Sequence, residues 1–93
     1  MTRINLKDNL RFFMENGEAV EVKAYWVTSS NVALVGYPKS GEPLMLVRYK
    51  SGKTYGYLGV PRQRVVAAAH AESVGEYVSR KIKPHYKVVN LNL

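Results

Sequence analysis

The residues best suited to chemistry in this sequence are cations and tyrosines on two neighbouring segments. Arg48 and Lys50 stand on the first segment, and Lys53, Tyr55 and Tyr57 stand on the second. Cationic side chains neutralise phosphates, and exposed rings stack on unpaired bases at about 1 to 3 kcal/mol per base. The pattern therefore predicts a surface that binds nucleic acid.

The same tyrosines have a structural interpretation. Aromatic side chains on one face of paired strands stabilise a sheet by about 0.2 to 1 kcal/mol each, so Tyr55 and Tyr57 suit a core as well as a ligand surface. Tyr49 alternates with Arg48 and Lys50 along the chain, which places the two cations on the opposite face of a strand. These two cations are therefore the better candidates for ligand contact.

A second group of cations surrounds the end of a predicted helix near the carboxyl terminus. It comprises Arg80, Lys81, Lys83 and Lys87, with His85 among them, and Arg62 and Arg64 stand at the start of an earlier predicted helix. Such a group can hold a phosphate backbone in a salt-dependent way. The alternative is ordinary charge complementation at a helix C-terminus.

The sequence offers no recognisable catalytic or metal centre. His70 and His85 are the only histidines and there is no cysteine, so a zinc site of the usual ligand count is not expected. Ser73 lies near both histidines in sequence, but it has capping-box spacing to Glu76, which explains it as a helix N-cap. We expect a non-enzymatic protein without a cofactor.

The positive charge is confined to the second half of the chain. The net charge is +7 over 93 residues. Residues 1–46 hold five basic and five acidic side chains, whereas residues 47–93 hold nine basic ones against Glu72 and Glu76. A one-sided positive field attracts polyanions, either nucleic acid or an acidic protein surface.

Periodicity predicts the elements that position these groups. Leu6, Leu10 and Phe13 recur at helical spacing and predict a helix at about 5–16, and alternation predicts a strand at 18–27. Further strands are expected at 32–37, 44–50 and 53–60, separated by turn residues. Helices are expected at 62–71, after Pro61, and from Ser73 to the residues before Pro84, with a last edge strand at 86–89.

A run of residues in this order and spacing resembles the KTSC family, which is named for an extension at the C terminus of some lysyl-tRNA synthetases. The residues that carry the resemblance are Ser29-Ser30, Gly36-Tyr37, Met45-Leu46-Val47-Arg48-Tyr49, Ser51-Gly52, Tyr55-Gly56-Tyr57, Val60-Pro61, Ala71-Glu72-Ser73-Val74-Gly75-Glu76-Tyr77, Ile82 and Tyr86. The resemblance implies a small β-meander followed by helices, found in stand-alone proteins, some of them phage-encoded, and as an appended domain. The synthetase link implies contact with RNA.

Two features depart from the family pattern. Pro38 stands where an Asp often follows the tyrosine, and residues 1–27 are additional. We therefore divide the chain into an extension at 1–27, a KTSC-like domain at 28–89 and a tail at 90–93. The fold class expected is α+β: a small antiparallel meander with an N-terminal helix and strand and two C-terminal helices packed on the sheet.

Composition predicts one small soluble domain. The absence of cysteine fits a reducing compartment, and no apolar run has the length of a signal peptide core or a membrane span. We expect a cytoplasmic protein of a bacterium or a phage-infected host. The expected function is binding of nucleic acid, RNA ahead of DNA, and the alternative is a phage-type effector that inhibits a host protein through the same basic face.

Overall fold

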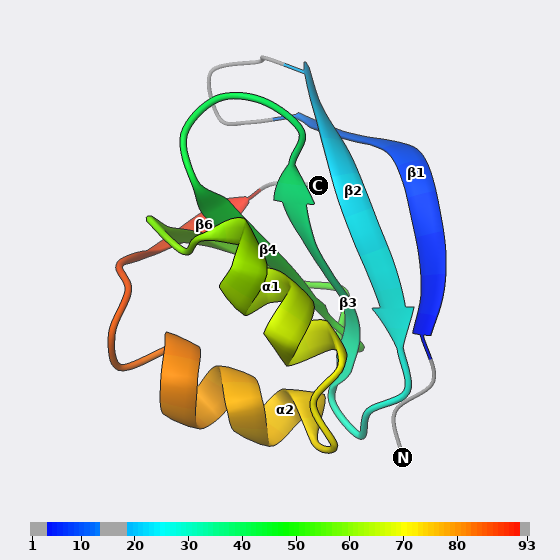
Figure 1. Ribbon diagram of the computed structural model, residues 1–93, viewed down its shortest axis with the longest axis vertical. Helices are drawn as coiled ribbons and strands as arrows, with labels where there is room; N and C mark the ends of the chain where they lie inside the picture. Colours follow the sequence, from blue (N-terminus) through cyan, green and yellow to red (C-terminus); the bar gives the residue numbers. More distant parts are fainter. Residues whose placement is uncertain (1–3, 14–18, 92–93) are drawn as a thin grey trace.

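The computed structural model describes residues 4–13 and 19–91, and its centre is a six-stranded antiparallel sheet. Its strands are hydrogen-bonded in the order in which they occur along the chain, and Figure 1 shows the helices on one face of the sheet. The strands are β1 (Ile4–Phe13), β2 (Ala19–Val27), β3 (Val32–Pro38), β4 (Leu44–Tyr49), β5 (Thr54–Leu58) and β6 (Val88–Leu91). The helical layer comprises α1 (Arg62–Ala69), α2 (Val74–Tyr77) and a π-helical turn, η1 (Val78–Ile82). The α+β class with a meander and C-terminal helices is confirmed.

The N-terminal helix predicted at 5–16 is wrong, because residues 4–13 form β1, which pairs antiparallel with β2. The even-numbered positions Ile4, Leu6, Leu10 and Phe12 also alternate with period two, which competes with the helical spacing. The register of its pairing with β2 shifts between Lys7 and Leu10, which marks a β-bulge or similar irregularity in the strand. Residues 14–16 of the predicted helix lie outside the described residues. The strand predicted at 18–27 is present as β2.

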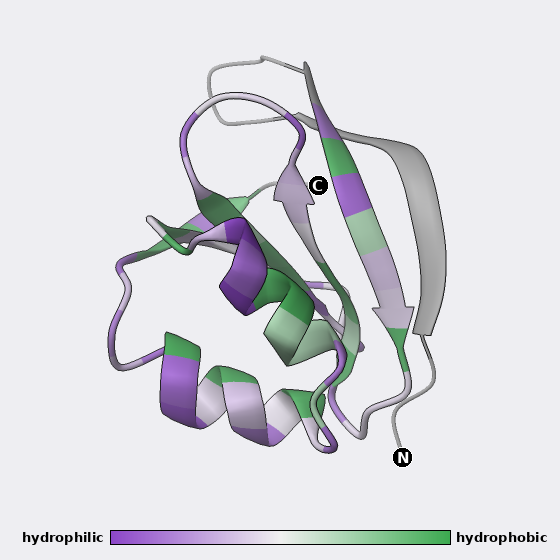
Figure 2. Cartoon of the chain, in the orientation of Figure 1, coloured by the Kyte–Doolittle hydropathy of each residue, from purple (hydrophilic) through white to green (hydrophobic). Residues whose placement is uncertain are grey.

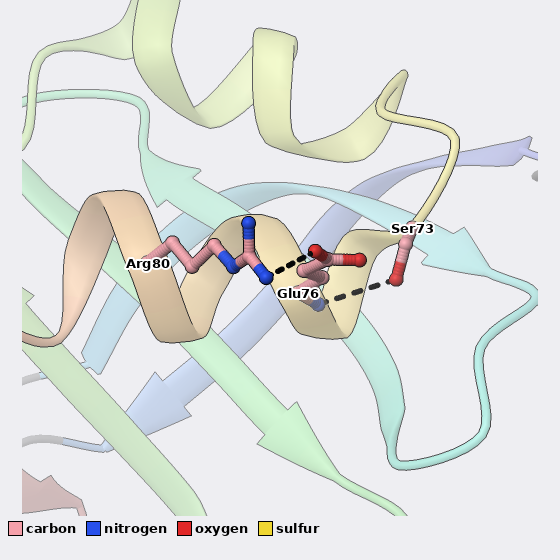
Figure 3. Close-up of polar contacts among 3 residues, drawn as sticks. All are labelled: Ser73, Glu76 and Arg80. Carbon is pink, nitrogen blue, oxygen red and sulfur yellow. Dashed lines mark hydrogen bonds and ion pairs between the residues drawn. The ribbon is translucent and has the colours of Figure 1, made fainter.

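The helices begin where the sequence predicts. Pro61 precedes α1, and the Arg64 amide donates to its carbonyl at 3.0 Å. At the start of α2 the Glu76 amide donates to the Ser73 hydroxyl at 3.3 Å, as predicted for a helix N-cap (Figure 3). The helix then widens, because the Lys83 amide bonds to the Val78 carbonyl five residues earlier at 2.9 Å, so η1 replaces the last part of the helix expected before Pro84.

The helix-covered face of the sheet carries the larger core. Apolar residues of the strands, among them Val35, Met45, Val47 and Tyr57, pack there against the helices. The helices contribute the fully or almost fully buried residues Val65, Ala68, Ala69, Val74, Val78 and Ile82. Figure 2 shows hydrophilic residues at the first turn of α1 and toward the end of η1, away from this core. The layer thus buries one face of each helix and leaves its cations at the surface.

The opposite face, which we call the helix-free face, has a second core built from strands alone. Val22 and Ala24 of β2, Leu34 of β3, Leu44 and Leu46 of β4, and Leu91 of β6 are buried together. A Cβ at Gly36 would lie 2.7 Å from the Lys23 carbonyl oxygen, so β2 approaches β3 at backbone contact on this side. A glycine is required there because any side chain would force the two strands apart. Within the described residues no helix is long and apolar enough to cross a membrane.

Candidate functional site

A shallow groove of about 500 Å³ at the edge of the helix-covered face brings cations, tyrosines and amides together. The β2–β3 turn, the β4–β5 hairpin and the residue after η1 form its walls. The residues that define its chemistry are Asn31, Tyr49, Lys50, Lys53, Tyr55 and Lys83, and Ser30 and Ser51 complete it. We call this site the basic groove.

Tyrosines form the floor of the basic groove. The rings of Tyr49 and Tyr55 meet edge to face, with centroids 5.8 Å apart and an interplanar angle of 70°. The hydroxyls of Tyr49 and Tyr57 lie 3.3 Å apart. Burial, followed by this hydrogen bond, raises the pKa of Tyr49 well above its usual value. The Tyr49 phenol is therefore neutral at physiological pH and adds no negative charge to the groove.

Three lysines supply the charge of the basic groove. The Nζ of Lys83 lies over the Tyr49 ring, 5.5 Å from its centroid, which is a cation–π contact. Lys50 and Lys53 are exposed on the hairpin between β4 and β5. None of the three forms an ion pair with a carboxylate among residues 21–91. Their charge is therefore available to an external anion.

The third wall of the basic groove is a turn that several contacts hold in place. The Ser29 hydroxyl accepts hydrogen bonds from the amides of Asn31 and Val32 at 3.4 and 3.3 Å. The Asn31 carbonyl accepts the Lys50 amide at 2.8 Å, which joins the turn to the β4–β5 hairpin. Gly75 of α2 packs directly against the Asn31 side chain, and a Cβ there would collide with Oδ1.

The structure places the predicted hairpin residues at different sites. Lys50, Lys53 and Tyr55 line the basic groove, whereas Tyr57 is 3% exposed and belongs to the core beneath it. Arg48 pairs with Leu34 and Thr54, which lie on the helix-free face, so it points away from the groove. The alternation with Tyr49 correctly placed Arg48 on the opposite face, so Arg48, a preferred candidate, lies outside the groove. The same prediction for Lys50 is wrong, because β4 ends at Tyr49 and Lys50 lies in the following turn, where it lines the groove beside that tyrosine.

The predicted helix-end cations do not gather at one place. Lys83 alone of this group reaches the basic groove. Arg80 forms an ion pair with Glu76 at 3.0 Å on the outer surface of α2 and η1 (Figure 3), and Lys81 lines the same surface. Lys87 precedes β6, where its carbonyl accepts the Leu58 amide.

The cations at the start of α1 lie at a separate position. Arg62 donates to the Lys39 carbonyl at 2.7 Å, and its guanidinium lies 5.2 Å from the centroid of the Tyr37 ring. It therefore fastens α1 to the loop between β3 and β4. Arg64 is exposed on α1.

His70 makes local contacts with α1 and β2. The Nδ1 of His70 lies 2.9 Å from the Val66 carbonyl oxygen, and its ring meets Tyr25 edge to face. In the part of the chain that the structure describes, no three His, Cys, Asp or Glu side chains are grouped as metal ligands.

Asn31 and Tyr49 define the chemistry of the groove but were not among the site residues predicted from the sequence. Tyr49 was assigned to the core, and Asn31 was assigned to a turn. Thr28-Ser29-Ser30-Asn31 has the composition of an ordinary turn, and only its contacts with Lys50 and Gly75 connect it to the groove. Gly75, between Ser73 and Tyr77, was the sequence feature that could have indicated this contact, because a glycine inside a helix allows another segment to approach closely.

Comparison with known proteins identifies the central part of the chain. A model described as KTSC domain matches residues 28–86, which span β3 to η1 and include every wall of the basic groove. A protein of Tsukamurella paurometabola is 34% identical over 65 residues, which are 70% of this chain and 96% of that protein.

Proposed function

This chain belongs to the KTSC domain family, and from the basic groove within the family's segment we propose that it is a non-catalytic nucleic-acid-binding module, with RNA preferred over DNA. The observation that supports the proposal is the convergence of Lys50, Lys53 and Lys83, none of them paired with a described carboxylate, around Tyr49 and Tyr55. A nucleic acid offers both the phosphates and the ring faces that such a groove suits.

The charge distribution supports an extended polyanion. Phosphate contacts by lysine release counterions from the nucleic acid, which makes electrostatic affinity additive over contacts. Lys50 and Lys53 lie on one hairpin and Lys83 lies on another element, so their charges are spread along the groove. Such a distribution suits successive phosphates of one strand.

The described lining of the groove lacks the histidine and carboxylate side chains that most often act as general bases. Its described lining residues are lysines, tyrosines, serines and one asparagine, and they include no carboxylate or imidazole. General acid–base chemistry needs a group that titrates near the working pH. We therefore propose binding without chemical conversion. The preference for RNA follows the family's relation to lysyl-tRNA synthetases.

Titration of labelled oligonucleotides tests the proposal. The ligands are a 12-residue single-stranded RNA, the DNA of the same sequence and a DNA duplex, each at a low and a moderate salt concentration. Three lysine contacts predict a slope of log affinity against log salt of about −2 for single strands. The RNA is expected to bind most tightly.

Charge-matched variants locate the binding surface. The combined change Lys50→Gln, Lys53→Gln and Lys83→Gln should abolish most of the salt-dependent affinity. The control variant combines Arg64→Gln, Lys81→Gln and Lys87→Gln, which remove the same charge from exposed positions outside the groove. This control should keep the salt-dependent affinity. Equal losses would show that only net charge matters and would contradict a groove-specific site. Absence of binding to all three ligands at low salt would contradict the proposed function and leave protein docking as the alternative.

A further inference from the structure

Asn31 is exposed, yet hydrogen bonds hold its backbone amide, its backbone carbonyl and the oxygen of its side chain. Its amide donates to the Ser29 hydroxyl, and its carbonyl accepts the Lys50 amide. Its Oδ1 accepts a hydrogen bond from the Ser29 hydroxyl at 3.3 Å and lies against Gly75. Exposed side chains usually keep rotamer freedom, so an exposed residue held this firmly is preorganised for contact.

The hydrogen bonds of Ser29 determine which end of the Asn31 amide is held. A serine hydroxyl has one donor and two acceptor positions. The amides of Asn31 and Val32 occupy both acceptor positions, so the hydroxyl proton must be donated. Its partner must be an acceptor, which is Oδ1 of Asn31. Oδ1 therefore accepts from Ser29, and Gly75 leaves little room for a second donor, so the Nδ2 amino group is the end of Asn31 that remains available.

The position of that amino group fits a ligand in the basic groove. Asn31 lines the groove together with Tyr55 and the three lysines. A base that stacks on Tyr55 presents its edge in the plane of the ring, where proteins read unpaired bases by hydrogen bonds. Tyr49 is less suited to stacking, because Lys83 already covers its face.

We infer that Asn31 determines the base preference of the basic groove by donating from Nδ2 to a carbonyl oxygen on the edge of an unpaired nucleotide. The inference rests on the proposed function and adds to it the ligand class: a single strand with a carbonyl-bearing base at this position. Because Oδ1 already accepts from Ser29 and Gly75 crowds it, Asn31 is poorly placed to accept from an exocyclic amino group. Uracil, which bears a carbonyl where cytosine bears an amino group, is favoured.

Oligouridine and oligocytidine of equal length test this inference. The wild-type chain should bind oligouridine about 2- to 12-fold more tightly, the range that one hydrogen bond gives. The substitution Asn31→Asp keeps the acceptor for Ser29 and replaces the donor with a second acceptor, which can accept from the amino group of cytosine. It should abolish or reverse the preference for uridine.

The matched control is Ser30→Asp, which adds the same negative charge at a neighbouring residue of the groove. It should weaken both oligonucleotides equally and keep their ratio. A purely structural role for Asn31 would leave the ratio unchanged in Asn31→Asp, and that result would overturn the inference, as would equal affinities in the wild type. Failure of the wild type to bind either oligonucleotide would instead contradict the proposed function itself.

Discussion

The two faces of the sheet bury apolar side chains in different ways. The helix-covered face packs Met45, Val47 and Tyr57 against α1, α2 and η1. The helix-free face buries Leu34 and Leu46 in a cluster whose members all come from strands. Both sets of side chains are at most 3% exposed.

The difference explains where a ligand surface can form. The helices add a second layer above one face of the sheet. The basic groove lies at the edge of that layer, between the residue after η1, the β2–β3 turn and the β4–β5 hairpin. The helix-free face carries Arg48 but also two buried polar atoms, Trp26 Nε1 and Thr54 Oγ1, with no hydrogen-bond partner in the described structure. In this molecule the cation on the helix-free face is therefore not part of the groove, which forms where the sheet and the helical layer meet.

The largest expected effect compares two adjacent residues that face opposite cores. Met45→Ala and Leu46→Ala should each lower the free energy of unfolding by about 2 to 5 kcal/mol, because each removes a fully buried side chain. Urea denaturation measures both. A cost below about 1 kcal/mol for Leu46→Ala alone would show that the helix-free face is not a second core.

A smaller effect separates two glycines on the helix-free face. Gly36→Ala should cost about 1 to 3 kcal/mol, because the new Cβ meets the Lys23 carbonyl oxygen at 2.7 Å and backbone must move. Gly56→Ala should cost less, because the nearest atoms are the ends of the Leu44, Val89 and Leu91 side chains. Thermal unfolding of both variants tests this order. Equal losses would contradict a backbone contact specific to β2 and β3.

The smallest effect concerns the unpaired hydroxyl of Thr54. Thr54→Val keeps the shape and removes a buried group that has no partner in the described structure, so stability should stay equal or rise by about 1 kcal/mol. Thr28→Val at an exposed turn is the control and should change little. A loss of stability in Thr54→Val would reveal that the hydroxyl is hydrogen-bonded in solution.

Most of the fold followed from local sequence signals, and the failure at the N terminus has a physical cause. Alternation and turn residues predicted β2 to β5, and Pro61 and Ser73 predicted the helix starts. The β1 segment was mistaken for a helix because Leu6, Leu10 and Phe13 match helical spacing, which competes with the period of two of Ile4, Leu6, Leu10 and Phe12. Its partner is β2, the next strand along the chain, and this pairing could not be predicted once the segment had been assigned to a helix.

The candidate site was predictable residue by residue but not as an assembly. The sequence identified Lys50, Lys53, Tyr55 and Lys83 among the cations and rings, together with seven further candidates outside the groove. The exposed ion pair of Arg80 with Glu76 and the contact of Lys83 with the Tyr49 ring were not predicted. Asn31 remained unrecognised because its role depends on Ser29, Lys50 and Gly75, which come from three different elements.

The order of the strands has a consequence for how the molecule assembles. From β1 to β5 every partner is the next strand along the chain, so each pairing closes only a short loop at small entropic cost. The pairing of β5 with β6 closes a much longer loop, residues 59–87, which contains the helices. We expect the amides of β6 to be the last to acquire protection from hydrogen exchange during refolding. The β5–β6 pairing would then be the slowest step in forming a sheet whose other strands pair locally.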